Sequence, residues 1–288
     1  MKTRLITSAV GIGVLITVLC LFDTIVFDLV IAVICLIAIH EIYKAFHFEK
    51  ALYIYIGFVP YTLLIMLSNF ELVRAWILPV SYVFALYLAI CVILNSQTIN
   101  FGKLAGMALF SSVVILCFFS LIYLKRLLPP ERYNFDAIYF ILLILGFAWG
   151  GDSAAYFTGR ALGKHKLAPV VSPHKTVEGA IGGVLGSMLL GVLVTLGYTL
   201  FFGKIAGITI ESLGIRYYLA IMVLGGIGSV LGILGDLFAS AVKRQCDIKD
   251  YGTIFPGHGG VLDRFDSVMF IAPFVAMVVT VVFYSFRP

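Results

Sequence analysis

The hydrophobic residues of this chain fall into long runs of about 20, separated by short polar stretches. A helical run of this length spans the hydrocarbon core of a bilayer. The expected fold is therefore all-α, a polytopic integral membrane protein with about nine transmembrane helices and a polar cavity open to the cytoplasm. The predicted spans are residues 5–22, 24–40, 51–68, 75–95, 105–124, 136–158, 177–202, 216–242 and 265–285.

The first two runs are separated only by Asp23 and Thr24. Lys2 and Arg4 precede the first run, as basic residues do in a signal peptide. The run continues to Phe22, however, without a clear small-residue cleavage site, and a second run follows at once. We therefore expect the first run to stay in the mature protein as a helix.

Composition agrees with a membrane protein and excludes an ordinary soluble domain. Hydrophobic residues make up 61% of the chain and charged residues only 12%, against about 25% in typical soluble domains. Two regions are expected: residues 1–135, whose helices serve packing, dimer or lipid contacts, and residues 136–288, which hold the chemistry. Cytoplasmic loops are predicted at 159–176 and 243–264, and Asp28 is expected to be the one buried acid of the first region.

The distribution of basic residues predicts the orientation. Counting loops from the N-terminus as zero, the even-numbered side carries 13 of the 20 lysines and arginines. Because basic loops stay in the cytoplasm, this side is assigned there. The expected location is the cell inner (cytoplasmic) membrane, with a multi-pass topology and the active site facing the cytoplasm.

A dense polar cluster interrupts the apolar pattern near the C-terminus. The stretch "KRQCDIKDYGTIFPGHGGVLDRFD", residues 243–266, holds four cations, four carboxylates, a histidine and four glycines. Just before it, Asp236, Ser240 and Lys243 fall on one face if the preceding helix continues to Arg244. A carboxylate at the apolar end of a span costs free energy, so Asp236 is expected to face a polar cavity or a cation. The alternative is that Asp236 only pairs with a basic residue at the helix end.

The carboxylates of this region suggest a metal. Asp263 and Asp266 are three residues apart and share a face if the last span begins there. Together with Asp236 they offer the oxygen ligands that Mg²⁺ prefers, usually alongside water and substrate phosphates. We therefore predict a metal site formed by Asp236, Asp263 and Asp266, with Mg²⁺ as the cofactor and room for a second metal ion.

The glycine-rich loop suggests a phosphate site. Glycine and proline between residues 252 and 260 forbid a continuous helix, and exposed amides in such a loop can bind phosphate oxygens. A segment of this kind is more often a plain turn. Because Lys249, His258 and Arg264 lie in or beside this segment, anion binding is favoured here.

At this point a family resemblance becomes clear. Residues 240–266 resemble the signature of CDP-diacylglycerol synthase (phosphatidate cytidylyltransferase), a multi-span family that carries its signature near the C-terminus. The matching positions are Ser240, Val242, Lys243, Arg244, Lys249, Asp250, Gly252, Phe255, Pro256, His258, Gly259, Gly260, Val261, Asp263, Arg264, Phe265 and Asp266.

A second block, "GDSAAYFTGRALGKHKLAPVVSPHKTVEG", is similar to the family's segment one loop earlier. Its matching positions are Asp152, Ala155, Tyr156, Gly159, Arg160, Ser172, Pro173, Lys175, Thr176, Glu178 and Gly179. A plain helix start, capped by Thr176 and Glu178, is the competing interpretation of those two residues. His174 stands where many relatives have lysine, so no role is assigned to it.

The resemblance implies that CTP and phosphatidic acid give CDP-diacylglycerol and pyrophosphate. The residues assigned to catalysis are Asp236, Lys243, Arg244, Lys249, Asp250, His258, Asp263, Arg264 and Asp266. Those assigned to substrate binding are Asp152, Tyr156, Arg160, Ser172, Lys175, Thr176, Glu178, Ser240, Gly259 and Gly260. The expected partners are CTP, phosphatidic acid and the lipid bilayer; no nucleic acid is expected, and a homodimer is compatible with the family.

Three other functions are compatible with parts of this sequence. A transporter also places acids at membrane depth beside glycine-broken helices, but its polar groups should lie near mid-bilayer rather than at one mouth. A CDP-alcohol phosphotransferase would carry a D-G-x-x-A-R motif, which is absent. An ether-lipid relative acting on archaeal phosphates is the nearest enzymatic rival, and a substrate panel separates it.

Two groups of glycines lie in the apolar runs, at 179, 182, 183 and 186 and at 225, 226, 228 and 232. Small residues at this spacing let helices approach closely inside a membrane. We expect these positions to pack against neighbouring helices.

Overall fold

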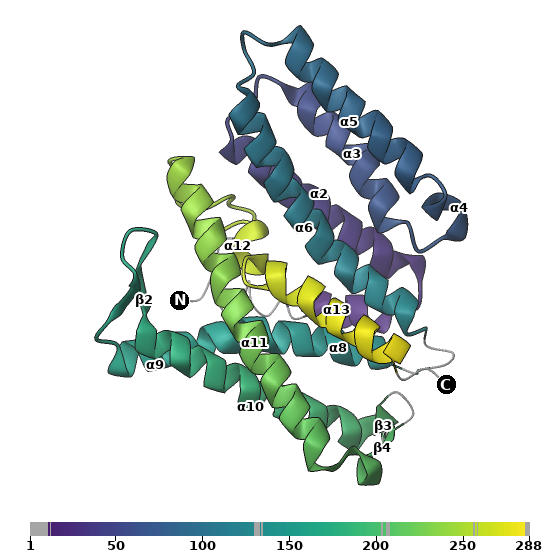
Figure 1. Cartoon of the computed structure of the whole chain (residues 1–288), viewed down its shortest axis with the longest axis vertical. Helices are drawn as coiled ribbons and strands as arrows, with labels where there is room; N and C mark the ends of the chain where they lie inside the picture. The colour runs from purple at the N-terminus through teal and green to yellow at the C-terminus, as the bar shows by residue number, and fades with distance from the viewer. Residues whose placement is uncertain are drawn as a thin grey trace. The chain divides into compact units, whose positions relative to one another are not determined.

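The structure is a computed structural model that describes residues 11, 13–129, 133, 135–202, 204–205, 208–255, 257 and 259–285. The chain divides into two compact units (Figure 1). Unit 1 contains residues 1–122 and 243–265, and unit 2 contains residues 123–242 and 266–288. The predicted division at residue 135 separated a packing region from a catalytic region, and it stays a prediction. The two compact units follow another boundary, because residues 243–265 belong to the same unit as the N-terminal helices.

The described residues confirm a predominantly helical, multi-pass membrane protein. Six helices are long and apolar enough to cross a bilayer, and two shorter apolar ones, Leu52–Met66 and Val268–Val282, accompany them. Of the predicted span 5–22, residues 5–10 and 12 lie outside the described residues, and residues 13–20 are helical. The six long helices are Ile25–Ala45, Ile77–Leu94, Phe101–Leu127, Asp136–Leu162, Val177–Phe202 and Gly214–Gln245.

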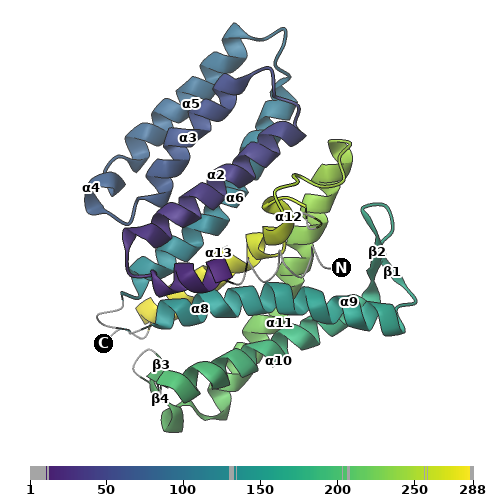
Figure 2. The same cartoon turned by 180° about the vertical axis from the view of Figure 1, so that it is seen from behind.

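Unit 1 is built mainly from antiparallel neighbours in the chain. Helices α2 (Ile25–Ala45), α3 (Leu52–Met66) and α5 (Ile77–Leu94) pack in that order, and the short α4 (Glu71–Arg74) follows α3 (Figure 2). Thr24 begins α2 by accepting a hydrogen bond from the Val26 amide, at 3.2 Å. This cap explains why two apolar runs separated by only two residues form separate elements. Helix α6 (Phe101–Leu127) and the single turn α12 (Leu262–Phe265) complete the named elements.

Unit 2 begins with one long helix that contains a π-turn. Helix α8 (Asp136–Leu145) continues through η1 (Gly146–Gly150) into α9 (Gly151–Leu162). A π-turn breaks the usual pattern of backbone hydrogen bonds and is common at functional sites. Here the Ser187 hydroxyl donates to the Phe147 carbonyl at 2.8 Å, with both groups buried. The turn lies directly before Asp152, so it sets the direction in which that side chain points.

Removing the Ser187 hydroxyl tests this support. The Ser187→Ala variant should lose about 1 kcal/mol of stability, because a buried carbonyl loses its partner. The measurement is the thermal unfolding midpoint in detergent. Ser153→Ala is the matched control, since the exposed Ser153 hydroxyl bonds only to Trp149 within its own helix segment. Equal losses in the two variants would contradict the role of Ser187.

Helix α10 (Val177–Phe202) packs along α9 through small residues. A Cβ added at Gly179 would lie 2.9 Å from the Ala155 carbonyl, and one at Gly183 would lie 3.1 Å from the Ala155 Cβ. Helix α11 (Ile210–Gln245) likewise approaches α13 (Val268–Ser285), where a Cβ at Gly232 would lie 2.8 Å from Ile271. The predicted close packing at both glycine groups is confirmed.

Two features of unit 2 differ from the sequence prediction. The loop after α9 forms an antiparallel hairpin of β1 (Lys166–Ala168) and β2 (Ser172–Thr176), and a second small pair joins β3 (Lys204–Ile205) and β4 (Ile208–Thr209). Short polar strands leave no periodic apolar signal, so they were not predicted. Figure 2 shows the first hairpin projecting from the junction of α9 and α10.

Candidate functional site

In unit 1, Asp263 is the centre of the polar cluster. It lies on α12, and only 8% of it is exposed. One carboxylate oxygen, Oδ1, accepts from Lys243 Nζ at 2.9 Å. The other, Oδ2, accepts from the backbone amides of Tyr251 at 2.8 Å and Gly260 at 3.0 Å. These three donors hold the Asp263 carboxylate in one orientation.

Lys243 is held in place as firmly as its partner. Its ammonium lies 5.4 Å from the ring centre of Tyr251, a separation that allows a cation–π contact. The Tyr251 ring in turn packs on Phe110, with ring centres 5.7 Å apart. The predicted phosphate-binding lysine therefore sits beside a predicted metal carboxylate, with its ammonium group over an aromatic ring.

The loop that wraps around Asp263 depends on glycine. Gly259 has a φ of +86°, a conformation that L side chains rarely adopt, and a Cβ there would lie 2.8 Å from the Asp263 carboxylate. The Phe255 amide also donates to the Gly259 carbonyl at 3.0 Å, which closes the loop. The Gly260 amide already donates to Asp263 within the protein. Substrate binding by Gly259 and Gly260 stays a prediction.

Other charged residues of the cluster point to solvent. Arg244, Lys249, Asp250 and Arg264 are all exposed, and three of them are cations. This exposure suits groups that must meet an anionic ligand. His258 and Pro256 lie outside the described residues, so the role predicted for His258 stays a prediction. Burial raises the pKa of the nearby Cys246 thiol, which disfavours a thiolate nucleophile there.

In unit 2, Asp236 is the corresponding acid. Helix α11 runs through Arg244 as predicted, and the Ser240 hydroxyl donates to Asp236 Oδ1 at 3.2 Å. The second oxygen, Oδ2, pairs with Lys175 Nζ at 2.5 Å. Asp236 therefore faces a cation, as its position predicts, and this cation comes from strand β2 rather than from the end of its own helix.

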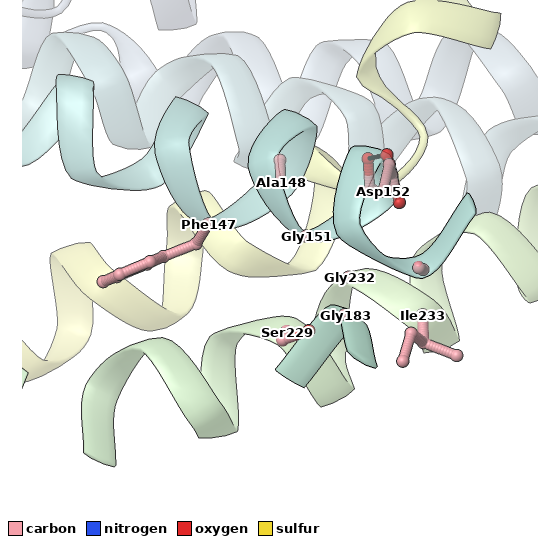
Figure 3. A pocket seen from close by; sticks show the side chains of 10 residues that line it. Phe147, Ala148, Gly151, Asp152, Gly183, Ser229, Gly232 and Ile233 are labelled. Atoms are coloured by element: carbon pink, nitrogen blue, oxygen red, sulfur yellow. Dashed lines mark hydrogen bonds between the residues drawn. The ribbon is translucent and has the colours of Figure 1, made fainter. Parts of the chain in front are cut away.

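Asp152 belongs to a small pocket in unit 2. The Ser267 hydroxyl donates to Asp152 Oδ2 at 2.8 Å, and both residues line the pocket. Figure 3 shows Gly151 and Asp152 on one helix, with Gly183, Ser229 and Gly232 on neighbouring segments. Glycines on three helices leave the space, and the oxygens of Asp152, Ser229 and Ser267 supply its polar lining. The space is about 10 Å³, enough for a group the size of one water molecule.

Asp266 does not share a helical face with Asp263, as the sequence would require for the predicted arrangement. Asp263 and Asp266 share a face only in a continuous helix, but the helix is broken between α12 and α13. The Asp266 side chain accepts from the Ser267 amide at 2.9 Å, a local hydrogen bond that competes with helix continuation. The expectation of one shared helical face is therefore wrong, and a metal role for Asp266 stays a prediction on other grounds.

Thr176 and Glu178 take structural contacts at the start of α10. The Thr176 hydroxyl accepts from the Gly179 amide at 3.1 Å, which confirms the predicted helix cap. Glu178 accepts from the Lys164 amide at 3.0 Å, from the His165 amide, and from His165 Nδ1 at 2.6 Å. The Glu178 carboxylate thus ties the entry of the β1–β2 hairpin to α10.

Glu178→Ala should release this hairpin entry. The loss of three hydrogen bonds should increase hydrogen exchange at residues 164–166, by about tenfold if each bond contributes roughly 0.5 kcal/mol or more. Exchange measured by mass spectrometry checks this, with Glu49→Gln, an exposed change in unit 1, as control. Unchanged protection at 164–166 would show that the hairpin pairing alone fixes this entry.

The remaining predicted substrate residues have less defined surroundings. Tyr156 is exposed beside Phe157, with ring centres 5.5 Å apart, and Arg160 is exposed on the last turn of α9. Ser172 begins β2 and is partly buried. Their roles in substrate binding stay predictions.

Each unit, taken by itself, carries oxygen donors of the kind that a hard divalent cation binds, Asp263 in unit 1 and Asp236 in unit 2. Carboxylate and hydroxyl oxygens are the ligands that Mg²⁺ prefers. Asp263 and Asp236 each already face a positive charge, supplied by Lys243 and Lys175. Among the described residues, no three acids, histidines or cysteines are gathered within one site for a metal.

One acid that was not predicted from the sequence, Glu41, contacts the loop around Asp263. Glu41 is buried on α2 and accepts from the amides of Val261 and Leu262 in the signature segment. The expectation that Asp28 is the one buried acid of the first region is therefore wrong. A signal existed, since Glu41 follows an apolar run and a buried acid is costly unless it is paired. The span had been predicted to end at residue 40.

Comparison with known proteins gives a family. A family model described as "Cytidylyltransferase family" matches residues 2–282. The phosphatidate cytidylyltransferase of Bacillus subtilis (strain 168) is 38% identical over 184 residues, which is 64% of this chain and 61% of that protein.

Two staphylococcal relatives have the same name. The phosphatidate cytidylyltransferase of Staphylococcus haemolyticus (strain JCSC1435) is 44% identical over 138 residues, and that of Staphylococcus aureus (strain COL) is 40% identical over 140 residues. Each alignment covers 48% of this chain and 48% of the relative. The chain thus spans less than two thirds of the length of these relatives.

Proposed function

Because the chain belongs to the cytidylyltransferase family, we propose that it transfers a cytidylyl group from CTP to phosphatidic acid. The products are CDP-diacylglycerol and pyrophosphate, and the process served is phospholipid biosynthesis. The observation that carries this proposal is the signature loop itself, in which Asp263 is fixed by two backbone amides and by Lys243. The names of the relatives support the same activity.

The chemistry needs charge control more than a strong base. The phosphate of phosphatidic acid is already an anion at neutral pH, so it can attack the α-phosphorus of CTP without deprotonation by the protein. The oxygen–phosphorus bond to the β-phosphate breaks, and pyrophosphate leaves with its electrons. The main barrier is the approach of two polyanions and the charge that develops on the phosphates, which fixed cations stabilise.

The basic residues of the signature would bind the phosphates of the two substrates. Lys243 is fixed beside Asp263, whereas Arg244, Lys249 and Arg264 are exposed. We assign these four to the phosphates of CTP and phosphatidic acid. His258 is assigned to phosphate contact or proton movement, and Asp250 to the same loop.

The proposed cofactor is Mg²⁺, with a second metal ion admitted. Asp236, Asp263 and Asp266 are the residues that would hold it, by virtue of their carboxylate oxygens. When bound, the ion would neutralise charge on the α-phosphate and the leaving pyrophosphate. Lys175 would then be free to turn from Asp236 toward substrate phosphates, whereas Lys243 would stay beside Asp263.

The proposed setting is the cell inner membrane, with nine spans. The lysine-rich and arginine-rich even-numbered loops face the cytoplasm, where CTP is available, and the polar cavity opens to that side. A homodimer is part of the proposal. The exposed apolar row of α10, which includes Leu185, Leu189 and Leu193, suits lipid or a second copy.

A direct assay tests the activity. Purified protein in detergent is incubated with CTP, phosphatidic acid and Mg²⁺, and CDP-diacylglycerol and pyrophosphate are measured. We expect both products in equal amounts, with CTP preferred over ATP, GTP and UTP. Pyrophosphate release without phosphatidic acid, or no lipid product at all, would contradict the proposal. An archaeal ether-lipid phosphate in a parallel reaction separates the nearest enzymatic alternative.

A further inference from the structure

Glu41 joins the N-terminal helices of unit 1 to the signature segment. It lies in the last turns of α2, with only 3% exposed. Its Oε1 accepts from the Val261 amide at 2.9 Å, and its Oε2 accepts from the Leu262 amide at 2.8 Å. These contacts link residues about 220 positions apart in the chain. Both carboxylate oxygens are therefore used by backbone donors of the loop.

The loop is shaped to admit this carboxylate. A Cβ added at Gly252 or at Gly260 would overlap Glu41 Oε1. A side chain at either position would require the Glu41 carboxylate or the loop to move from this arrangement. Two glycines of the signature are thus explained by the close approach of one buried acid, rather than by contact with a phosphate.

Three successive backbone amides, those of residues 260–262, donate hydrogen bonds to either Asp263 or Glu41. The Gly260 amide donates to Asp263, and the next two donate to Glu41. Because these amides open the turn α12, on which Asp263 lies, their direction fixes where the Asp263 carboxylate stands. A shift of this backbone would also move the carboxylate that holds Lys243.

We propose that Glu41 is a positioning residue for cytidylyl transfer, which fixes the signature segment so that Asp263 and Lys243 keep their places. This role rests on the proposed function. Glu41 itself does not contact substrate in this scheme, because its side chain is buried and both oxygens accept from the loop.

Glu41→Gln is the informative substitution. The amide keeps the shape of the side chain but offers one acceptor oxygen, and its NH₂ group faces an amide donor. Glu41→Asp keeps the charge but withdraws the carboxylate by one methylene. Glu49→Gln is the matched control, because it makes the same chemical change at an exposed position shortly after α2.

Hydrogen exchange of the full-length protein in detergent gives a readout that needs no activity. In Glu41→Gln, exchange at Val261 and Leu262 should rise about tenfold or more, while exchange within α10 stays at the wild-type level. Glu49→Gln should match wild type throughout. Unchanged protection at Val261 and Leu262 in Glu41→Gln would overturn the proposal.

Steady-state rates of CDP-diacylglycerol formation give the second readout, normalised to the monodisperse fraction of each preparation. Supporting residues of this kind typically alter activity by about 10- to 100-fold. We expect kcat of Glu41→Gln to fall in that range, Glu41→Asp to recover part of it, and Glu49→Gln to keep the wild-type value. Raised exchange with a wild-type kcat per folded molecule would reduce Glu41 to a structural anchor and overturn the proposal. A wild-type protein without activity would overturn the proposed function and this role together, although the exchange data would still report whether Glu41 holds the loop.

Discussion

The Asp263→Asn variant is expected to lose about 10³-fold or more of its cytidylyl transfer while it expresses and assembles like wild type. Asp263 has one oxygen on Lys243 and the other on two backbone amides. An asparagine has one acceptor oxygen, so its NH₂ group must face a donor on one side. The variant also loses the negative charge that the proposed cation and Lys243 both need, and losses of this size follow removal of charge-stabilising groups.

The measurement for Asp263→Asn is kcat for CDP-diacylglycerol formation, together with the elution profile in detergent. A local cost of about 1–3 kcal/mol is expected in the loop from the unpaired donor. Asp247→Asn is the matched control, because Asp247 is an exposed acid of the same segment and asparagine tolerates its φ of 55°. Near-wild-type turnover in Asp263→Asn would remove this residue from the chemistry.

The Asp236→Asn variant is expected to lose about 10²- to 10³-fold in kcat. Asparagine keeps the size of the side chain and can still accept from Ser240. It loses the charge that pairs with Lys175 and that would hold a metal. The expected defect is therefore chemical rather than structural, and the thermal midpoint should change little.

Lys175→Gln separates two explanations of that loss. If Asp236 serves only to hold Lys175, Asp236→Asn should cost no more than Lys175→Gln, which removes the ammonium group itself. If Asp236 holds a cation, Asp236→Asn should lose substantially more kcat than Lys175→Gln. A loss in Asp236→Asn no larger than that in Lys175→Gln would restrict Asp236 to holding the lysine.

Local sequence signals predicted much of the fold. The helical runs after residue 24, the cap at Thr176 and the continuation of α11 past Ser240 all follow from hydrophobicity and short-range hydrogen bonding. The family match confirms the resemblance read from the two motif blocks. These features depend on neighbours a few residues apart, so one sequence is enough to find them.

Features that depend on distant partners were missed. The contact of Glu41 with Val261 joins the two ends of the chain and leaves no local pattern. The π-turn at Gly146–Gly150 receives a hydrogen bond from Ser187, which lies on another helix. The break between α12 and α13 is instead a local feature, where the Asp266 side chain accepts from the adjacent Ser267 amide, and no hydrophobic pattern marks it.

The central proposal is that Asp236, on α11, and Asp263, on α12, hold one cation for the joining of nucleotide and lipid phosphate. Electron paramagnetic resonance of Mn²⁺, titrated in the presence of CTP, tests it without relying on turnover. We predict that Asp236→Asn and Asp263→Asn each weaken Mn²⁺ binding by about tenfold or more, whereas Asp247→Asn binds like wild type. Wild-type Mn²⁺ affinity in either of the first two variants would contradict the shared ion.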